Sequence, residues 1–204
     1  MMARPNRVLS VGLLTCALVL TGCSKDATVA SPSGSAGPAT ASTGTGSDPS
    51  GTATAQGDEV RSRSGGFTVV PPEGWAEATD KAKSVAGIDL VLLSSKKVDD
   101  FANNLVVTAA DGDQSVLDAE LVKGRQQLAA AGRTVSSAPD KTIAGATAVG
   151  FTTAFAQQGV KVLARSYGIE RAGRVYLLTL SSSQADAAHA MTEFDALLST
   201  WAWT

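Results

Sequence analysis

The sequence predicts an α+β domain in which helices pack on an antiparallel sheet. Apolar runs of strand length occur early, at residues 66–70, 88–93 and 105–109. Three longer strand-like runs occur later, at about residues 147–156, 160–169 and 174–182. One helical pattern separates the two groups and another ends the chain. This segregation of strands and helices is typical of α+β folds.

The first strand, residues 66–70, ends at Pro71 and Pro72, because proline cannot donate a hydrogen bond to a strand ladder. Residues 72–75 (Pro-Glu-Gly-Trp) then predict a turn, with Trp75 directly after it.

A helix is expected after the turn Asp111-Gly112-Asp113. Ser115 and Asp118 have the spacing of a capping pair that opens a helix. Gly132 is suited to end it, because glycine adopts the left-handed conformation of a C-terminal cap without strain. One face of this helix is apolar and predicts contact with the core: Leu117, Leu121 and Leu128.

The three later strands are expected to form a meander. The segments 157–159 and 171–173 connect them, and links this short join antiparallel neighbours. A closing helix is expected from about Gln184, with apolar residues at steps of three and four. These residues are Met191, Phe194, Leu198 and Trp201.

Residues 1–22 have the pattern of a lipoprotein signal peptide. Arg4 and Arg7 make the start basic, and the apolar run over residues 8–20 is shorter than the roughly 20 residues that span a bilayer as a helix. The segment Leu20-Thr21-Gly22-Cys23 resembles the lipobox of bacterial prolipoproteins. The alternative is a plain signal peptide followed by a chance cysteine.

The lipobox resemblance implies cleavage before Cys23 and attachment of lipid, palmitate included, to its thiol. The lipid would hold the protein on the extracytoplasmic face of the cell membrane, because two or more acyl chains anchor stably. Residues 23–65 consist mainly of Ser, Thr, Gly, Ala and Pro, which cannot bury enough apolar surface to fold. We expect a disordered linker with a reach of roughly 35 Å, glycosylated or not, before a folded domain at residues 66–204.

Charge and cysteine content argue against a nucleic-acid-binding protein and against a domain held by an internal disulfide. The chain has 17 basic and 19 acidic residues, and loss of Arg4 and Arg7 leaves 15 basic residues and a net charge of −4. A weakly acidic protein is a poor ligand for phosphate backbones, so no nucleic acid partner is expected. Cys16 lies in the predicted signal peptide, so Cys23 has no cysteine to pair with in the mature chain.

Several segments resemble PsbP-like domains and the actinobacterial LpqN-type lipoproteins. Residues 67–75 (Phe-Thr-Val-Val-Pro-Pro-Glu-Gly-Trp) resemble the opening of these domains. Residues 101–107 (Phe-Ala-Asn-Asn-Leu-Val-Val) are similar to their F-x-x-N-hydrophobic segment. Residues 143–151, with Ile143-Ala144-Gly145 leading to Ala148 and Phe151, and the final Trp201-Ala202-Trp203 match as well.

Together these segments cover nearly all of residues 66–204. The resemblance implies an α-β-α sandwich around an antiparallel sheet. Members include photosystem accessory subunits, a yeast nuclear-import cofactor and many lipoproteins, and they bind or assist rather than catalyse. Their binding surfaces differ, so the resemblance transfers no functional residue.

Residues for catalysis or metal binding are scarce. His189 is the single histidine, so neither a His-based triad nor a zinc site with several His or Cys ligands is expected. Residues 111–115 begin like a calcium loop, but its twelfth position is Val122 instead of Glu. Asp99 and Asp100 have the character of a solvated loop rather than a paired acid and base. No cofactor is expected.

Three residues are candidates for ligand contact. Asn104 heads an apolar strand and needs partners if it is buried, from a ligand or from loop backbone groups. Trp75 and Trp201 lie near the ends of predicted elements, where they could stack on a ligand or pack in the core.

The sequence thus predicts a non-enzymatic, membrane-anchored binding or accessory lipoprotein that recognises a protein or a cell-envelope component. The alternative is a carrier of a small or lipid-like ligand in an apolar pocket, which a solid core would disfavour. An envelope hydrolase would need a constellation of residues that the sequence does not show.

Overall fold

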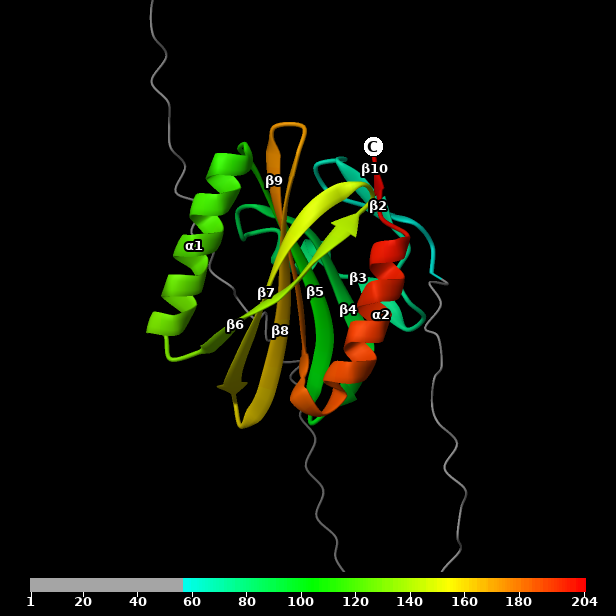
Figure 1. Ribbon diagram of the computed structural model, residues 1–204. Helices are drawn as coiled ribbons and strands as arrows, with labels where there is room; N and C mark the ends of the chain where they lie inside the picture. Colours follow the sequence, from blue (N-terminus) through cyan, green and yellow to red (C-terminus); the bar gives the residue numbers. More distant parts are fainter. Residues whose placement is uncertain (1–56) are drawn as a thin grey trace, which may run out of the picture. The chain divides into compact units, whose positions relative to one another are not determined.

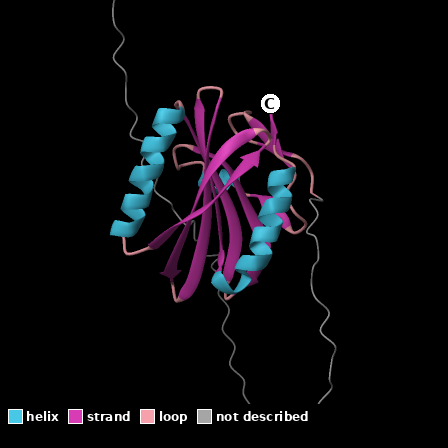
Figure 2. Ribbon diagram, in the orientation of Figure 1, coloured by secondary structure: helices cyan, strands magenta, loops and turns pink. Residues whose placement is uncertain are grey.

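The computed structural model describes residues 57–204, and seven antiparallel strands form their central sheet (Figures 1 and 2). The strand order is β3-β4-β5-β9-β8-β7-β6. The strands are β3 (Trp75–Glu77), β4 (Ile88–Val98), β5 (Phe101–Asp111), β6 (Thr134–Ile143), β7 (Ala146–Gln157), β8 (Val160–Arg171) and β9 (Arg174–Ser183). The predicted signal peptide, Cys23 and most of the predicted linker lie outside the described residues.

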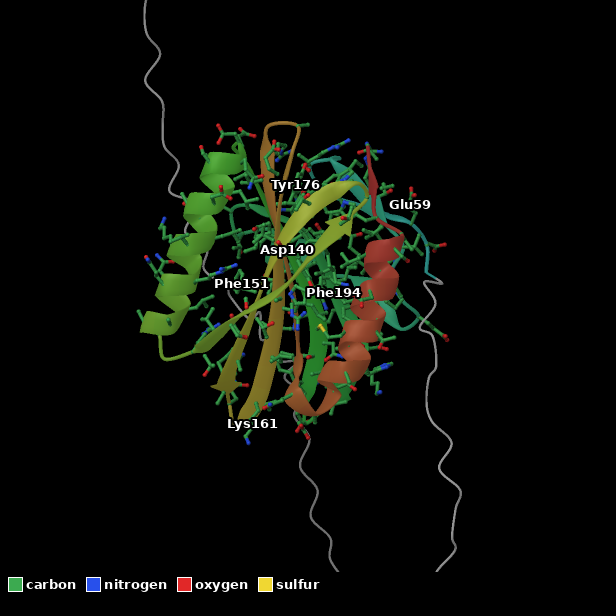
Figure 3. The ribbon with its side chains drawn as sticks, viewed as in Figure 1. Glu59, Asp140, Phe151, Lys161, Tyr176 and Phe194 are labelled. Atoms are coloured by element: carbon green, nitrogen blue, oxygen red, sulfur yellow. The ribbon has the colours of Figure 1, made fainter. Side chains whose placement is uncertain are left out.

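Two helices cover opposite faces of this sheet, α1 (Gln114–Ala130) and α2 (Ala187–Ser199). In β9, Leu177 packs under α1, whereas its neighbour Leu178 belongs to the core under α2. Adjacent strand residues point to opposite faces, so the sheet has one core on each side. In Figure 3, Phe194 extends from α2 and Phe151 lies on the side towards α1. The predicted α+β class and its antiparallel sheet are confirmed.

A small second sheet joins the two ends of the domain. It consists of β1 (Val60–Arg61), β2 (Phe67–Val69) and β10 (Ala202–Trp203), in the order β1-β2-β10. Strand β1 lies within the stretch predicted as linker, yet Val60 pairs with Val69. Strand β1 has only two residues, which is too few for a periodic apolar pattern, and the composition around it is that of a linker. The sequence therefore did not predict it.

The predicted meander is confirmed, because β7, β8 and β9 are consecutive neighbours in the sheet. Their two turns place Gln158-Gly159 and Ala172-Gly173 at positive φ. Two-residue turns of this kind match the right-handed twist of the strands, and they need glycine at the second position.

Helix α1 ends as predicted but begins differently. The Asp113 side chain, and not the predicted pair Ser115 and Asp118, accepts the capping hydrogen bond from the Val116 N–H. Gly132 has φ 76°, and the N–H of Arg133 donates to the Leu128 carbonyl, as in a glycine-terminated helix.

Two further boundaries differ from the sequence prediction. Residues 184–186 form a short 3-10 helix, η2 (Gln184–Asp186), so α2 starts at Ala187. Trp201 lies beyond the end of α2, but it still packs in the core, where its ring stacks on Phe67 with centroids 3.9 Å apart. A second 3-10 helix, η1 (Thr79–Ala82), packs against β4.

Candidate functional site

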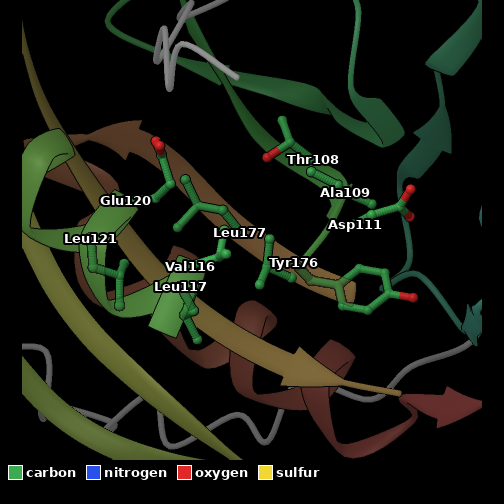
Figure 4. A pocket seen from close by; sticks show the side chains of 11 residues that line it. Thr108, Ala109, Asp111, Val116, Leu117, Glu120, Leu121, Tyr176 and Leu177 are labelled. Carbon is green, nitrogen blue, oxygen red and sulfur yellow. The ribbon is translucent and has the colours of Figure 1, made fainter. Parts of the chain in front are cut away.

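An apolar pocket opens between α1 and the strands β5 and β9 (Figure 4). Its volume is about 70 Å³. It is lined from α1 by Val116, Leu117, Glu120 and Leu121, from β5 by Thr108, Ala109, Ala110 and Asp111, and from β9 by Val175, Tyr176 and Leu177.

The local sequence explains why α1 lies where it does. A Cβ atom on Gly168 of β8 would come within 2.8 Å of Leu117 Cδ1, so this glycine lets the helix approach the sheet. A Cβ atom on Gly112 would lie 2.8 Å from Val116 Cγ1, so the first turn of α1 is also held close. The helix packs against β6, β8 and β9, and Thr108 and Ala110 of β5 remain half-buried at the open side of the pocket.

Two carboxylates lie at the edge of the pocket, and they differ in their exposure and in their hydrogen-bond partners. Asp111 is exposed, and its Oδ1 lies 3.9 Å from Arg174 Nε. Glu120 Oε1 accepts a hydrogen bond from Lys123 at 3.4 Å. Glu120 Oε2, however, is buried and has no partner among residues 57–204. A buried acceptor without a partner favours a donor supplied from outside the chain.

Tyr176 connects this pocket to the core on the other side of the sheet. It lines the pocket and also packs edge-on against Phe67, with centroids 5.9 Å apart. Burial raises the pKa of the Tyr176 phenol, an effect that the Arg174 guanidinium partly opposes. The phenol therefore stays neutral at physiological pH.

The geometry suits a protruding side chain better than a whole small molecule. Sites for drug-sized ligands measure about 300–1,000 Å³, well above this pocket. Its lining offers the carboxylate of Glu120 and the hydroxyl of Thr108 but no imidazole or thiol. Val116 at the mouth is 39% exposed, so part of its side chain is open to solvent beside the pocket.

The three predicted ligand-contact residues do not line this pocket. Trp75 and Trp201 are buried in the core under α2. Asn104 is buried on the α1 face, where its Nδ2 donates to the Ala102 carbonyl at 3.2 Å. These positions match the packing and backbone-bonding alternatives, and ligand contact by the three residues stays a prediction.

His189 and the paired acids also lie apart from the pocket. His189 is exposed on α2, with Nε2 3.5 Å from Glu193 Oε1. Asp99 and Asp100 form the tip of the β4–β5 hairpin at positive φ, and Asp99 accepts a hydrogen bond from Ser183 Oγ. Both acids border an open depression of about 740 Å³ between hairpin tips, with Lys161 on its far side.

Neither a metal centre nor a membrane span is found in the part of the chain that the structure describes. No three His, Cys, Asp or Glu side chains of residues 57–204 are grouped closely enough to hold a metal ion. Across the same residues, neither helix has the length and apolar character needed to cross a bilayer.

Sequence reasoning missed the pocket, and the sequence has no specific signal for it. Val116 and Val122 both lie off the buried Leu117–Leu121–Leu128 face of α1, yet only Val116 lines the pocket. Single exposed apolar residues are common on folded domains, so these valines do not mark the site in the sequence.

Comparison with known proteins shows the class of fold. No known family profile and no curated protein sequence matches this chain. Among solved structures, LpqN of Mycobacterium tuberculosis has a TM-score of 0.52 at 15% identity, over 73% of this chain and 91% of LpqN. The cyanobacterial PsbP protein CyanoP of Synechocystis has a TM-score of 0.50 at 15% identity, over 78% of this chain and 98% of CyanoP.

A third similar structure is that of a longer protein of Bacteroides thetaiotaomicron, with a TM-score of 0.50 at 15% identity. The match covers 73% of this chain but spans only about half of the Bacteroides protein, 49%. The domain thus has a PsbP-like fold, as the sequence resemblance implied.

Proposed function

We propose that this protein is a non-catalytic binding or accessory lipoprotein of the bacterial cell envelope, of the LpqN type, that docks a partner protein at the pocket under α1. The observation that carries this proposal is the pocket itself, with its exposed valine and its unpaired carboxylate oxygen. The similar fold of LpqN, a protein described as involved in cell envelope biogenesis, supports the assignment to the envelope.

The chemistry of the pocket defines the partner group. Its apolar walls suit an apolar side chain, and Glu120 Oε2 suits a nearby Lys or Arg on the same partner. A basic group there would meet a partly desolvated carboxylate, where charge-assisted hydrogen bonds are strongest. An apolar residue beside a basic one is therefore the expected recognition element.

The size of the pocket disfavours the carrier alternative. The core under α2 is filled by buried aromatic and aliphatic side chains, and the pocket under α1 is too small for an acyl chain. Native mass spectrometry of protein purified from its own host tests this directly. A stoichiometric lipid held non-covalently, beyond the anchor proposed at Cys23, would contradict docking of a protein side chain.

Two valines of α1 provide a matched test of the docking site. Val116 lines the pocket, whereas Val122 is 57% exposed and does not. A photo-crosslinking amino acid at position 116 should trap a discrete partner in cells, and the same group at position 122 should not. Equal crosslinking from both positions would contradict the assignment of the site.

The membrane anchor is proposed from Leu20-Thr21-Gly22-Cys23. Replacement Cys23→Ser should block lipid attachment and leave uncleaved precursor or shed protein. A processed Cys23→Ser protein that still partitions into detergent would show that the lipobox interpretation is wrong.

The absence of turnover is proposed on the residues present. The single histidine, His189, is exposed and distant in sequence and fold from the pocket-lining residues. Incubation of the soluble domain with peptidoglycan, ester and phosphate substrates should give no product. Hydrolysis that His189→Ala or one Asp or Glu substitution abolishes, with the fold intact, would overturn the proposal.

A further inference from the structure

A charged side chain lies on the α2 side of the sheet without an acidic partner. Arg165 of β8 is opposite Leu180 of β9 and Thr152 of β7. Leu180 belongs to the core under α2, and directly paired residues share a face, so Arg165 lies on that side too. Arg165 is half-buried, and its Nε is shielded and has no hydrogen-bond partner within residues 57–204.

The acids on the elements that cover this side are already engaged. Their partners are Asn103 and Lys96 for Asp186, His189 for Glu193, and Lys141 for Asp195. No ion pair within the described residues includes Arg165. An Arg side chain has five N–H donors in a fork that suits the oxygens of a carboxylate or a phosphate, and here no such anion is paired with it.

Two more buried polar atoms without partners lie beside Arg165 in the sheet. Ser182 of β9 is 0% exposed, and its Oγ makes no hydrogen bond within the described residues. The β8–β9 register places Ser182 diagonally next to Arg165. Asn103 of β5 is 4% exposed, and its Oδ1 is unpaired. Asn104 pairs with Ser181 of β9, so one further step of this register places Asn103 opposite Ser182. Buried polar groups are rarely left unpaired, so three neighbours require an explanation.

The acid nearest to this group fixes the orientation of Asn103. Asp186, at the N-cap of α2, makes no side-chain capping hydrogen bond and accepts instead from Asn103 Nδ2 at 2.7 Å. The Ala187 N–H at the start of α2 donates to the Gln184 carbonyl. Because the Asn103 amide nitrogen is held by Asp186, its Oδ1 is left as an acceptor.

From this arrangement we propose a binding site for a small oxyanion on the α2 side of the sheet, formed by Arg165, Ser182 and Asn103. Arg165 and Ser182 donate to the anionic oxygens. Asn103 Oδ1 accepts from a hydroxyl group, so the ligand carries a hydroxyl beside its charge. Hydrogen phosphate and α-hydroxy carboxylates have both groups, whereas acetate lacks the donor. This site is separate from the pocket under α1 and does not depend on it.

The test compares Arg165→Met with Arg171→Met, since Arg171 is an exposed residue at the end of the same strand. Thermal melting is measured in sodium phosphate, glycolate, acetate and chloride at equal ionic strength. Phosphate and glycolate should raise the melting temperature of wild type and Arg171→Met by a few degrees above chloride, and acetate by less, because a ligand that binds only the folded state stabilises it. Arg165→Met should respond to all four salts alike.

A second measurement keeps the proposal testable if Arg165→Met does not fold. In the wild-type domain, titration with inorganic phosphate should shift the Arg165 Nε–Hε NMR resonance saturably, and the Arg171 resonance should shift little. Equal, non-saturating shifts at both arginines would overturn the site, as would an unchanged phosphate response in folded Arg165→Met. A shift that saturates with acetate as readily as with phosphate would overturn the assignment of the hydroxyl to Asn103.

Discussion

The two sides of the sheet are built differently. On the α2 side, a core of many aromatic and aliphatic residues includes Phe67 from the start of the domain and Trp201 from its end. On the α1 side, the buried apolar cluster is small: Leu117, Leu121, Leu128, Phe151 and Leu177. The α1 side also carries the pocket and the exposed Val116 and Val122.

The α2 side supplies most of the stability of the fold, and the α1 side carries the proposed docking pocket. Buried area sets most of the folding free energy, so the larger α2 core holds the domain together. The α1 side can then leave apolar surface open without endangering the fold. The first and last parts of the described domain meet on the α2 side through the stacked rings of Phe67 and Trp201.

The largest expected effect follows from removal of the ring at the centre of the α2 core. Phe67 is 0% exposed, stacks on Trp201 and meets Tyr176 edge-on. Phe67→Ala should lower the free energy of unfolding by about 3–5 kcal/mol, which is the usual cost of emptying a site this size. Urea denaturation measures it. Leu121→Ala on the α1 side is the matched comparison, and it should cost only about 2 kcal/mol, because the new space joins an existing pocket. Equal losses would remove the distinction between the two sides.

A somewhat smaller effect is expected from shortening the chain. A domain beginning at Gly66 loses β1 and leaves Asp89 without the Ser64 N–H and Oγ, which now donate to it at 2.6 and 2.8 Å. Asp89 is 4% exposed, so the loss should cost about 2 kcal/mol. A domain beginning at Gly57 should melt like the longer chain. Identical melting of both shortened domains would show that β1 contributes nothing to stability.

The sequence predicted the elements with strong periodicity and missed those without it. Helix α1 and strands β7 to β9 have regular apolar spacing and recognisable turns, so both were found. Strand β6 was missed because it is a polar edge strand that contains Pro139, at a register shift between Ala138 and Lys141. Proline is tolerated at such edge irregularities, but in a sequence it argues against a strand.

The pocket could not be predicted for a different reason. Its lining residues come from β5, α1 and β9, and only the three-dimensional register of β5 on β9 brings Thr108 opposite Leu177. Glu120 looks in the sequence like an ordinary surface acid of a helix. Its position beside the pocket follows from the close approach of α1 to the sheet, which Gly112 and Gly168 permit through their lack of side chains.

Two glycines sharpen the comparison of the two sides further. A Cβ atom on Gly150 would lie 2.7 Å from Tyr167 Cε1 and 3.2 Å from the Pro139 carbonyl, so the α2 side would have to move backbone or a buried ring. On Gly168 it would meet only the tips of two leucines of α1, the nearest at 2.8 Å. Gly150→Ala should cost about 2–3 kcal/mol and Gly168→Ala about 1 kcal/mol, since the ends of two leucine side chains can move more readily than backbone or a buried ring. A Gly168→Ala domain less stable in urea than Gly150→Ala would mean that α1 is the more rigid side.

The smallest effect concerns the cap of α1 and its dependence on pH. The pKa of Asp113 is lowered from its ordinary value of 3.8, first by the hydrogen bond from the Ser115 hydroxyl and then by that from the Val116 N–H. A carboxyl whose pKa is lower in the folded state stabilises that state above the unfolded pKa, and it loses this contribution as pH falls through the folded pKa. Asn at the same position can also cap the helix, but it does not titrate. The difference in melting temperature between wild type and Asp113→Asn should therefore be small and constant from pH 5 to pH 7, and it should shift against wild type below about pH 4. If the melting temperatures of wild type and Asp113→Asn instead fall in parallel down to pH 2.5, the Asp113 carboxylate adds nothing beyond an uncharged cap. The contacts of its leucines would then be what holds α1 on the sheet.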